Sequence, residues 1–389
     1  MIYNEVRVGQ EIFMVPIEAR KNATQSPKVR EASFEDYPGI VSLESRYGLE
    51  SKTYDEWKRL WIDNPIYIEL QHRWPIGWVL ENDRQILGYF GNIPLSYELR
   101  GRKIIVATGR AWVVDARYRG YSVLLLHHFL YQQYVDLYLD TTANSEAARA
   151  FSAFGGSRVP VGRWDRSACW ITNYRGFLSN WLTRKVSPSA KSISYPLSAV
   201  LFLKDILSRK ALRGDQTGAE VRLCTSFDDR FDVFWEELRR ENSHVLLAVR
   251  TQEALEWHFK PALLQNRVWT LTIRNASRLV AYSIFLRRDN ARSGVKGVLL
   301  VDFQALGGHA DFLLPMFSWA LRRCQDEGIH LLVNVGLCFG KSNINKLAPY
   351  QRKWPSWSYF YKARDKSLAE TLSNPEVWAP SLFDGDGSL

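Results

Sequence analysis

The chain has 389 residues, of which 46% are hydrophobic and 24% charged, the composition of a soluble globular protein with two or three domains. No apolar stretch reaches the ~18 residues that a membrane-spanning helix needs. The N-terminus lacks the basic start and apolar block of a secretory signal. The four cysteines form no CxxC pair, which favours reduced thiols and a cytoplasmic location over disulfides or a zinc site.

Most of the net charge of +10 lies in one segment of the sequence. Residues 176–214 hold seven Lys or Arg and one Asp, and apolar residues such as those of 199–203 lie between the basic ones. No nucleic-acid-binding motif accompanies this charge. We therefore expect the segment to be structural or to make peripheral contact with a membrane surface, and we expect no DNA binding.

The first half of the chain predicts an alternation of strands and helices. In chain order these are a strand from Val29, a helix around Trp57 and Trp61, strands at Ile76–Leu80, Gln85–Ile93, Tyr97–Leu99, Lys103–Val106 and Arg110–Val114, a helix from Ser122 to about Tyr134, a strand at Leu137–Thr141 and a helix from Asn144. This order predicts an α+β fold in which helices cover a mostly antiparallel sheet.

The same order returns in the second half. Its predicted elements are strands at Val221–Cys224, Val268–Ile273, Leu279–Leu286, Val298–Phe303 and Ile329–Val335, with helices at Asp228–Arg240 and Asp311–Cys324. Each half also carries Val-Asp, then a long polar residue, then Gly, at Val114–Gly120 and Val301–Gly307. We interpret this as a tandem duplication. The predicted domains are an N-terminal tail (1–26), a first domain (27–175), a basic connector (176–218), a second domain (219–363) and a C-terminal tail (364–389).

The motif that indicates chemistry is Arg117-x-x-Gly120-x-Ser122, which lies between a predicted strand and a predicted helix. Such a turn can leave the first backbone N–H groups of the helix unpaired, so that they bind a phosphate or pyrophosphate. Gly allows a tight bend and a close approach, and Arg117 and Arg119 add positive charge. The alternative is an ordinary helix start with solvated arginines.

In this setting the motif resembles the pyrophosphate loop of the GNAT acyltransferase superfamily, Gln/Arg-x-x-Gly-x-Gly/Ala. One strand later, Asn144, Ala147 and Gly155 match the offsets of a second GNAT motif. The resemblance implies two GNAT-like domains in tandem, each a mostly antiparallel central sheet flanked by helices. It also implies a CoA-dependent N-acyltransferase that uses acetyl-CoA or another acyl-CoA, a small-molecule or peptidic amine as acceptor, and no metal. The residues that it implies for CoA binding are Val113, Val114, Arg117, Tyr118, Arg119, Gly120, Tyr121, Ser122 and Asn144.

The sequence departs from the family pattern where catalytic residues are expected. Phe151 stands where the family commonly has a Tyr that protonates the leaving CoA thiolate, and Thr108 and Arg110 stand where a carboxylate base often lies. The catalytic residues therefore stay unassigned. In the second half, Gln304-x-x-Gly307 keeps part of the loop but has lost its arginine. This copy is therefore interpreted as degenerate, shaping the acceptor cleft.

Two other functions stay open. One is a tandem GNAT-like transferase that uses aminoacyl-tRNA to modify a cell-wall precursor, where the basic connector would help. The other is a non-catalytic GNAT-like binding protein. Residues 336–342 resemble a P-loop, but their spacer has three residues where a Walker A sequence needs four. The histidines form no metal-binding pattern.

Overall fold

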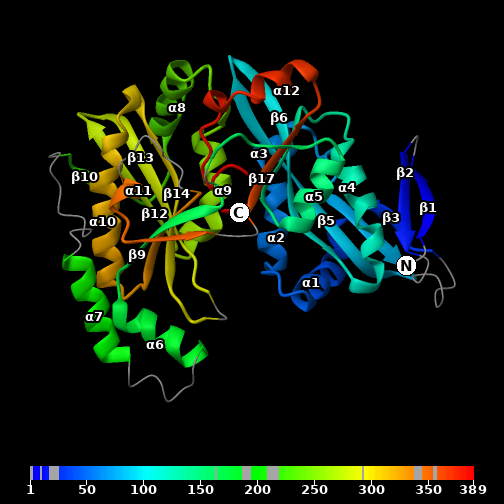
Figure 1. Ribbon diagram of the computed structural model, residues 1–389. Coiled ribbons are helices and arrows are strands. Elements are labelled where there is room, and N and C mark those ends of the chain that lie inside the picture. Colours follow the sequence, from blue (N-terminus) through cyan, green and yellow to red (C-terminus); the bar gives the residue numbers. More distant parts are fainter. Residues whose placement is uncertain are drawn as a thin grey trace.

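The structure is a computed structural model that describes residues 3–8, 11–16, 26–162, 164–185, 194–207, 219–290, 293–336, 344–353 and 357–389. Across these ranges the chain forms two large sheets, each flanked by helices, which lie side by side with the C-terminal end of the chain between them (Figure 1). A separate hairpin of β1 (Tyr3–Val8) and β2 (Glu11–Pro16) lies at the N-terminal end.

The first sheet is built mainly from the N-terminal half. Its strand order is β3 (Lys28–Glu31), β4 (Gly77–Asn82), β5 (Gln85–Leu99), β6 (Arg102–Val114), β7 (Leu137–Ala143), β17 (Ser358–Ala363) and β8 (Ser157–Arg158), and the short β11 (Leu247–Ala248) pairs with β5. The β6–β7 pair is parallel, and the other pairs are antiparallel.

The helices of this half are α1 (Tyr37–Arg46), α2 (Tyr54–Ile62), α3 (Pro65–Glu69), α4 (Ser122–Leu130) and α5 (Ser145–Ala153), with 3-10 turns at η2 (Phe34–Asp36) and η3 (Ala116–Tyr121). Three of these five helices, α2, α3 and α5, begin at side chains that cap them. Thr53 and Glu56 form a capping box at α2, and Asn64 caps α3 ahead of a proline at its first position. Trp57 and Trp61, four residues apart, are both buried against the sheet.

The second sheet repeats this arrangement. Its order is β10 (Val221–Cys224), β12 (Val268–Asn275), β13 (Arg278–Arg287), β14 (Gly297–Ala305), β15 (Leu331–Val335), β9 (Arg166–Ile171) and β16 (Tyr350–Lys353). The remaining helices of the chain are α6 (Tyr174–Lys185), α7 (Ser194–Leu207), α8 (Asp229–Glu241), α9 (Gln252–Leu264), α10 (Leu313–Asp326), α11 (Ile344–Leu347) and α12 (Lys366–Leu372). The 3-10 turns in this part of the chain are η5 (Leu306–Gly308), η6 (Ala310–Phe312) and η7 (Pro375–Val377). The parallel pair is β14–β15, at the place that β6–β7 takes in the first sheet.

The two halves exchange one strand each. β9 comes from the first half but pairs with β15, and β17 comes from the second half but pairs with β7. In both sheets the exchanged strand lies beside the second strand of the parallel pair. The predicted α+β class with two mostly antiparallel sheets is confirmed. The domain boundaries at residues 175 and 219 stay predictions. Because β9 and β17 are exchanged, each sheet contains one strand from the other predicted domain.

Several predicted elements differ from those observed. The strands predicted at Gln85–Ile93 and Tyr97–Leu99 are one strand, β5, and those predicted at Lys103–Val106 and Arg110–Val114 are one strand, β6, because β5 and β6 pair with each other over most of their length. The predicted connector contains α7 and all but the first two residues of α6, and the predicted C-terminal tail contains α12 and a buried segment. Residues 337–343, most of the P-loop-like stretch, and Cys338 with them, lie outside the described residues. Among the described residues no helix is long and apolar enough to cross a membrane.

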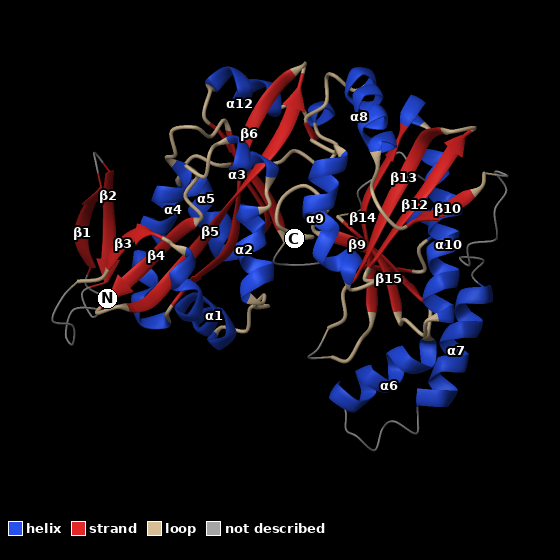
Figure 2. Cartoon of the chain, turned by 180° about the vertical axis from the view of Figure 1, so that it is seen from behind, coloured by secondary structure: helices blue, strands red, loops and turns tan. Residues whose placement is uncertain are grey.

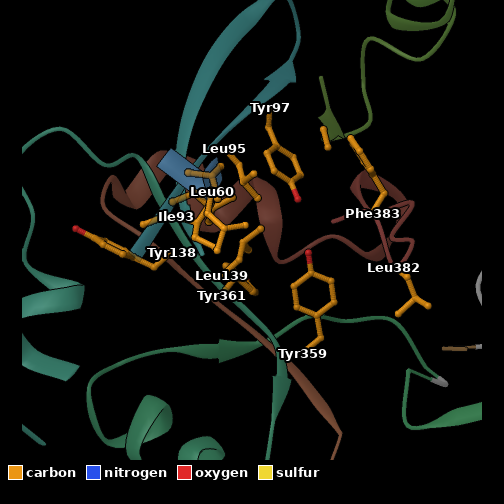
Figure 3. Close-up of a cluster of buried hydrophobic side chains, with 14 of the residues drawn as sticks. Leu60, Ile93, Leu95, Tyr97, Tyr138, Leu139, Tyr359, Tyr361, Leu382 and Phe383 are labelled. Carbon is orange, nitrogen blue, oxygen red and sulfur yellow. The ribbon is translucent and has the colours of Figure 1, made fainter. Parts of the chain in front are cut away.

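The two halves share a hydrophobic core. Side chains from both sheets and from residues 381–389, which we call the C-terminal segment, belong to one buried cluster. Figure 3 shows part of it, where Tyr97 and Tyr359 of the first sheet face Leu382 and Phe383 of the C-terminal segment. The halves are therefore one packed body, in which the C-terminal segment fills the junction.

Candidate functional site

The parallel strands β6 and β7 separate midway along their length. They pair from Val106 and Leu137 to Thr108 and Leu139, but β6 continues to Val114 and β7 to Ala143. Beyond Thr108, no described strand pairs with the β7-facing edge of β6. A strand edge of this kind presents backbone N–H and C=O groups that an extended ligand can bind.

A bulge in β6 produces local curvature at the same place. Arg110 pairs with Gly91 and Val113 with Tyr89, so that Ala111 and Trp112 together face one residue of β5. Ala111 has a positive φ of 54°, which is uncommon for a residue other than Gly. Bulges of this kind occur often beside active sites, where they bend a strand and redirect side chains. Here the bulge lies on the strand that lines the opening.

A cleft with a volume of about 760 Å³ occupies the opening between the strands. Both halves line it: β6 from Gly109 to Val114, β7 at Asp140, Thr142 and Ala143, α9 at Trp257 and His258, and the C-terminal residues 386–389. Of the residues predicted to bind CoA, those that line this cleft are Val113, Val114, Arg119, Ser122 and Asn144. Arg117, Tyr118, Gly120 and Tyr121 lie in the adjoining loop but do not line it.

The predicted pyrophosphate loop lies at one end of this cleft, between β6 and α4, and forms the 3-10 turn η3. The sequence predicted that the backbone N–H groups of this loop are unpaired, but two of them donate hydrogen bonds within the loop. The Tyr118 N–H donates to the Asp115 carbonyl at 2.8 Å, and the Ser122 N–H donates to the Arg119 carbonyl. The physical reason is that a 3-10 turn closes hydrogen bonds between residues three apart. Gly120 is not among the residues with positive φ, so its backbone angles do not require glycine. A bound ligand would require glycine here only because a side chain at this position would block its close approach.

Two residues of the second motif have structural roles. The side-chain oxygen of Asn144 accepts from the N–H groups of Glu146 and Ala147, at 2.9 and 2.8 Å, and so caps α5. Its amide nitrogen is the part available for contact with a ligand. Phe151 is fully buried and contacts the rings of Phe129 and Phe360, so this position supplies no proton donor to the cleft.

The C-terminal segment reaches the point where the two strands separate. Gly385 has a φ of 100°, and a Cβ there would lie 2.5 Å from Cγ2 of Thr141 on β7 and 3.3 Å from Oγ1 of Thr108 on β6. Only glycine allows this conformation and this approach. The next residue, Asp386, accepts a hydrogen bond of 3.1 Å from the Thr141 hydroxyl. The segment thereby places a second carboxylate beside Asp140.

These two carboxylates have raised pKa values. Burial, and after it the charge of Asp386, raise the pKa of Asp140 to about 7. Burial also raises the pKa of Asp386, against the opposing effect of Arg110. Two neighbouring acids in a desolvated site cannot both ionise easily, so they titrate as a coupled pair. A carboxylate whose pKa lies near neutrality is suited to accept a proton.

Residues of the second half hold this segment in place. The Ser388 hydroxyl forms a 2.8 Å hydrogen bond with Nε2 of His258, and the Gly387 carbonyl accepts from Arg288 at 3.1 Å. Burial lowers the pKa of His258 to about 3, so this histidine is a neutral structural partner at physiological pH. The cleft therefore depends on both halves, although its strand edge belongs to the first.

Cationic side chains also line the cleft. Burial, followed by the charge of Arg110, lowers the pKa of Lys52 to about 8. Arg267 and Arg288 come from the second half. The carboxylate of Glu50 pairs with Arg288, at 3.3 Å, so part of this positive charge is balanced. Among the described residues there is no group of three or more His, Cys, Asp or Glu that could hold a metal ion.

The corresponding loop of the second half contains its own anion. The N–H of Gly307 donates a 2.7 Å hydrogen bond to the carboxylate of Glu241, at the end of α8. Gly307 has a φ of 63°, and Asp302, the counterpart of Asp115, is buried and paired with Arg250. A protein carboxylate thus occupies a position where an anionic ligand would bind, which agrees with a degenerate second copy.

The sequence did not point to the two carboxylates. Asp140 lies in a strand that was predicted, but no motif marks it, and Asp386 lies in the segment interpreted as a tail. The pattern Asp384-Gly385-Asp386-Gly387 could have served as a signal. Acidic residues that alternate with glycines in a loop suggest a backbone conformation that only glycine adopts and a functional role for the acids.

Comparisons with known proteins agree on the fold. No family model and no curated protein matches the sequence. Among solved structures, an N-myristoyltransferase of Saccharomyces cerevisiae with bound myristoyl-CoA and inhibitors has a TM-score of 0.56 and 10% identity, covering 89% of this chain and 82% of its own. GCN5-related N-acetyltransferases of Anabaena variabilis (TM-score 0.52, 10% identity, 87% and 73% covered) and Kribbella flavida (TM-score 0.51, 10% identity, 87% and 71% covered) are also similar. These likenesses span both halves and confirm the fold that the sequence motifs implied.

Proposed function

We propose that this chain, which has the GNAT fold across two halves, transfers an acyl group from an acyl-CoA to an amine in the cleft of its first half. The observation that carries the proposal is the separation of β6 from β7, with Asp140 and Asp386 beside the open edge. An open strand edge can hold an extended thioester arm, and a carboxylate with a raised pKa can take the proton that the amine must lose.

The donor would lie along β6. Its pantetheine arm would pair with the edge at Val113 and Val114, where a backbone N–H can polarise the thioester carbonyl. Arg119 and Ser122 line the same cleft and would contact the pyrophosphate. The N–H groups of Tyr118 and Ser122 donate within the loop, so their use by the pyrophosphate requires a local change of hydrogen-bond partners.

The chemical step would be a direct transfer. The amine nitrogen attacks the thioester carbon, the C–N bond forms, the C–S bond breaks, and CoA leaves as the thiolate. The ammonium form of the acceptor gives up its proton to ionised Asp140 before the attack. The second proton leaves the nitrogen as the amide forms and passes to solvent water in the cleft. Because the buried Phe151 offers no hydroxyl, departure as the thiolate is the simplest route.

The acyl chain can be acetyl or longer. The motif alone favours acetyl-CoA, while one structural neighbour was solved with myristoyl-CoA. The proposed acceptor is a small-molecule or peptidic amine. The carboxylate pair in the cleft favours this enzymatic proposal over a non-catalytic binding protein, because a binding role gives no reason to place two like charges side by side in a partly buried site.

The test is a two-part measurement on the full chain. Acetyl-CoA and myristoyl-CoA are titrated into the protein, and thiol release is then followed with a panel of amines at about pH 8, above the raised pKa of Asp140. We expect Asp140→Asn to bind acyl-CoA as the unmodified protein does but to release thiol at least about 100-fold more slowly. Asp83→Asn, in the exposed β4–β5 turn, is the matched control and should change neither quantity. Absence of acyl-CoA binding would contradict the proposal.

A further inference from the structure

The helices α6 and α7 stand apart from the two sheets. They follow β9 and pack against each other, and in both views they project beyond the second sheet (Figures 1 and 2). We call them the helical hairpin, meaning residues 174–185 and 194–207. Neither helix lines the cleft of the first half.

The burial pattern of α7 is inverted. Its buried side chains are polar: Ser194, Ser198 and Asp205. The Asp205 carboxylate accepts hydrogen bonds from the hydroxyls of Tyr174 on α6, at 2.6 Å, and Tyr350 on β16, at 2.9 Å. A surface helix of a globular protein normally directs its apolar side chains to the core. In α7 the polar ones attach the helix to the protein.

Most of the large apolar side chains of α7 face outward. They are between 41% and 80% exposed: Tyr195, Leu197, Val200, Phe202, Leu203, Ile206 and Leu207. On α6, Trp181 is 47% exposed. Single exposed apolar residues are ordinary, but so many on one helix of 14 residues make a continuous apolar surface. Such a surface marks a site of interaction.

The positive charge of this region favours an anionic partner. Residues 176–214 hold seven Lys or Arg, and their one acidic residue, Asp205, is buried and hydrogen-bonded. Lys204 is exposed among the apolar side chains, and Arg175 lies over the Tyr195 ring, 5.7 Å from its centre. An exposed apolar face that carries a lysine, in a segment of the sequence with a positive excess, fits a helix that lies in the interface of an anionic bilayer.

We propose that the helical hairpin docks the protein on an anionic lipid bilayer, with α7 lying in the plane of the interface. The exposed apolar side chains of α7 enter the boundary between headgroups and acyl chains, and Lys204 contacts the headgroups. A second copy of the chain is the less suitable occupant, because it would bring together two segments with the same positive excess. The polar contacts of Asp205 keep the helix attached in this orientation.

The experiment is co-sedimentation of the full chain with lipid vesicles. One set of vesicles contains phosphatidylcholine alone, and the other contains phosphatidylcholine with phosphatidylserine. We expect binding to the second set that weakens as salt is added. The variant Val200→Ser/Leu203→Ser/Leu207→Ser should bind at least ~100-fold more weakly, because it removes three of the inserting side chains. These residues are exposed, so the variant should keep the thermal stability of the unmodified protein.

A matched control uses exposed apolar residues from elsewhere. The variant Leu223→Ser/Val233→Ser/Leu264→Ser removes side chains that are 46%, 56% and 71% exposed, on β10, α8 and α9. It should bind vesicles as the unmodified protein does. The proposal is overturned if the unmodified protein does not sediment with anionic vesicles, or if both triple variants lose binding equally. It is also overturned if sedimentation velocity shows a dimer that the α7 variant dissociates.

Discussion

The backbone N–H of Gly307 donates a 2.7 Å hydrogen bond to the carboxylate of Glu241. This bond distinguishes the two copies of the glycine loop. In the second half, α8 brings an acid of the protein onto the loop, whereas the loop of the first half carries Arg119 and opens on a cleft. We therefore expect the anionic donor to bind in the first half, and the second half to serve by shaping the cleft and holding the C-terminal segment.

The first prediction concerns the close approach of Gly385 to Thr141. Gly385→Ala should destabilise the protein by about 1–3 kcal/mol, because its Cβ would overlap Cγ2 of Thr141 and its φ of 100° strains any larger residue. Gly387→Ala is the control, since a Cβ there meets its nearest atoms at 3.5 Å and its φ is ordinary. Urea unfolding measures both. Equal stability of the two variants would show that the segment does not insert between β6 and β7.

The second prediction concerns the pH dependence of stability at Asp140. Its pKa is about 7 in the folded state, above the ordinary value of 3.8. Between these values the folded state holds a proton that the unfolded state has lost, so this group makes the protein less stable as the pH rises from about 4 to about 7. Asp140→Asn removes the effect.

We therefore expect Asp140→Asn to gain stability relative to the unmodified protein as the pH is raised. The measurement is the free energy of unfolding of both proteins at about pH 5 and about pH 8. The difference should shift in favour of the variant at the higher pH. A difference that is the same at both pH values would show that Asp140 has an ordinary pKa.

The third prediction concerns the buried ion pair at the junction of the halves. The guanidinium of Arg250 bonds to Asp302 at 2.8 Å and lies 3.6 Å from Asp384, and the Arg250 side chain is only 1% exposed. Arg250→Met leaves two carboxylates buried without a cation, which should cost about 3–5 kcal/mol. Arg222→Met, which breaks an exposed pair with Glu220, should cost less than about 1 kcal/mol. Similar losses in the two variants, measured by urea unfolding, would contradict this account.

The local parts of the fold could be predicted from the sequence. Periodicity and turn residues located β12, β13 and the helix α8 to within a few residues, because amphipathic spacing and capping act over short distances. The glycine motif at Gly120 lies between a strand and a helix, as expected. The strand exchange of β9 and β17 could not be predicted, because edge pairing depends on the complete arrangement of both sheets.

The site was predictable only in part. Asp386 contacts Thr141 across 245 positions of sequence, and no local pattern reports a contact of that separation. The raised pKa of Asp140 arises from burial, which a single sequence does not show. The sequence located basic and apolar residues in 176–214, but which side of α7 faces outward depends on the tyrosine hydroxyls that bind Asp205.

The fourth prediction concerns Arg119, which lines the cleft at the loop of the first half. Arg119→Ala should weaken CoA binding by about 1.5–3 kcal/mol, the usual loss when a charge-assisted hydrogen bond is removed. Arg117→Ala, in the same loop but outside the cleft, is the control and should change the affinity less. Calorimetric titration with CoA measures both, and a larger loss at Arg117 would show that the phosphates bind elsewhere.

The most direct test of the central claim is calorimetric titration of CoA into the unmodified protein and two glycine variants. Gly120 lies between Arg119 and Ser122, which both line the cleft. Gly120→Val should therefore lose at least about 10-fold in affinity with little change in stability, because a branched side chain at this point of the loop would crowd the pyrophosphate. Gly307→Asn should change the CoA affinity by less than about 2-fold, and it should preserve the loop because asparagine tolerates the φ of 63° at this position. Loss of CoA binding in Gly307→Asn but not in Gly120→Val would show that the donor site lies in the other half.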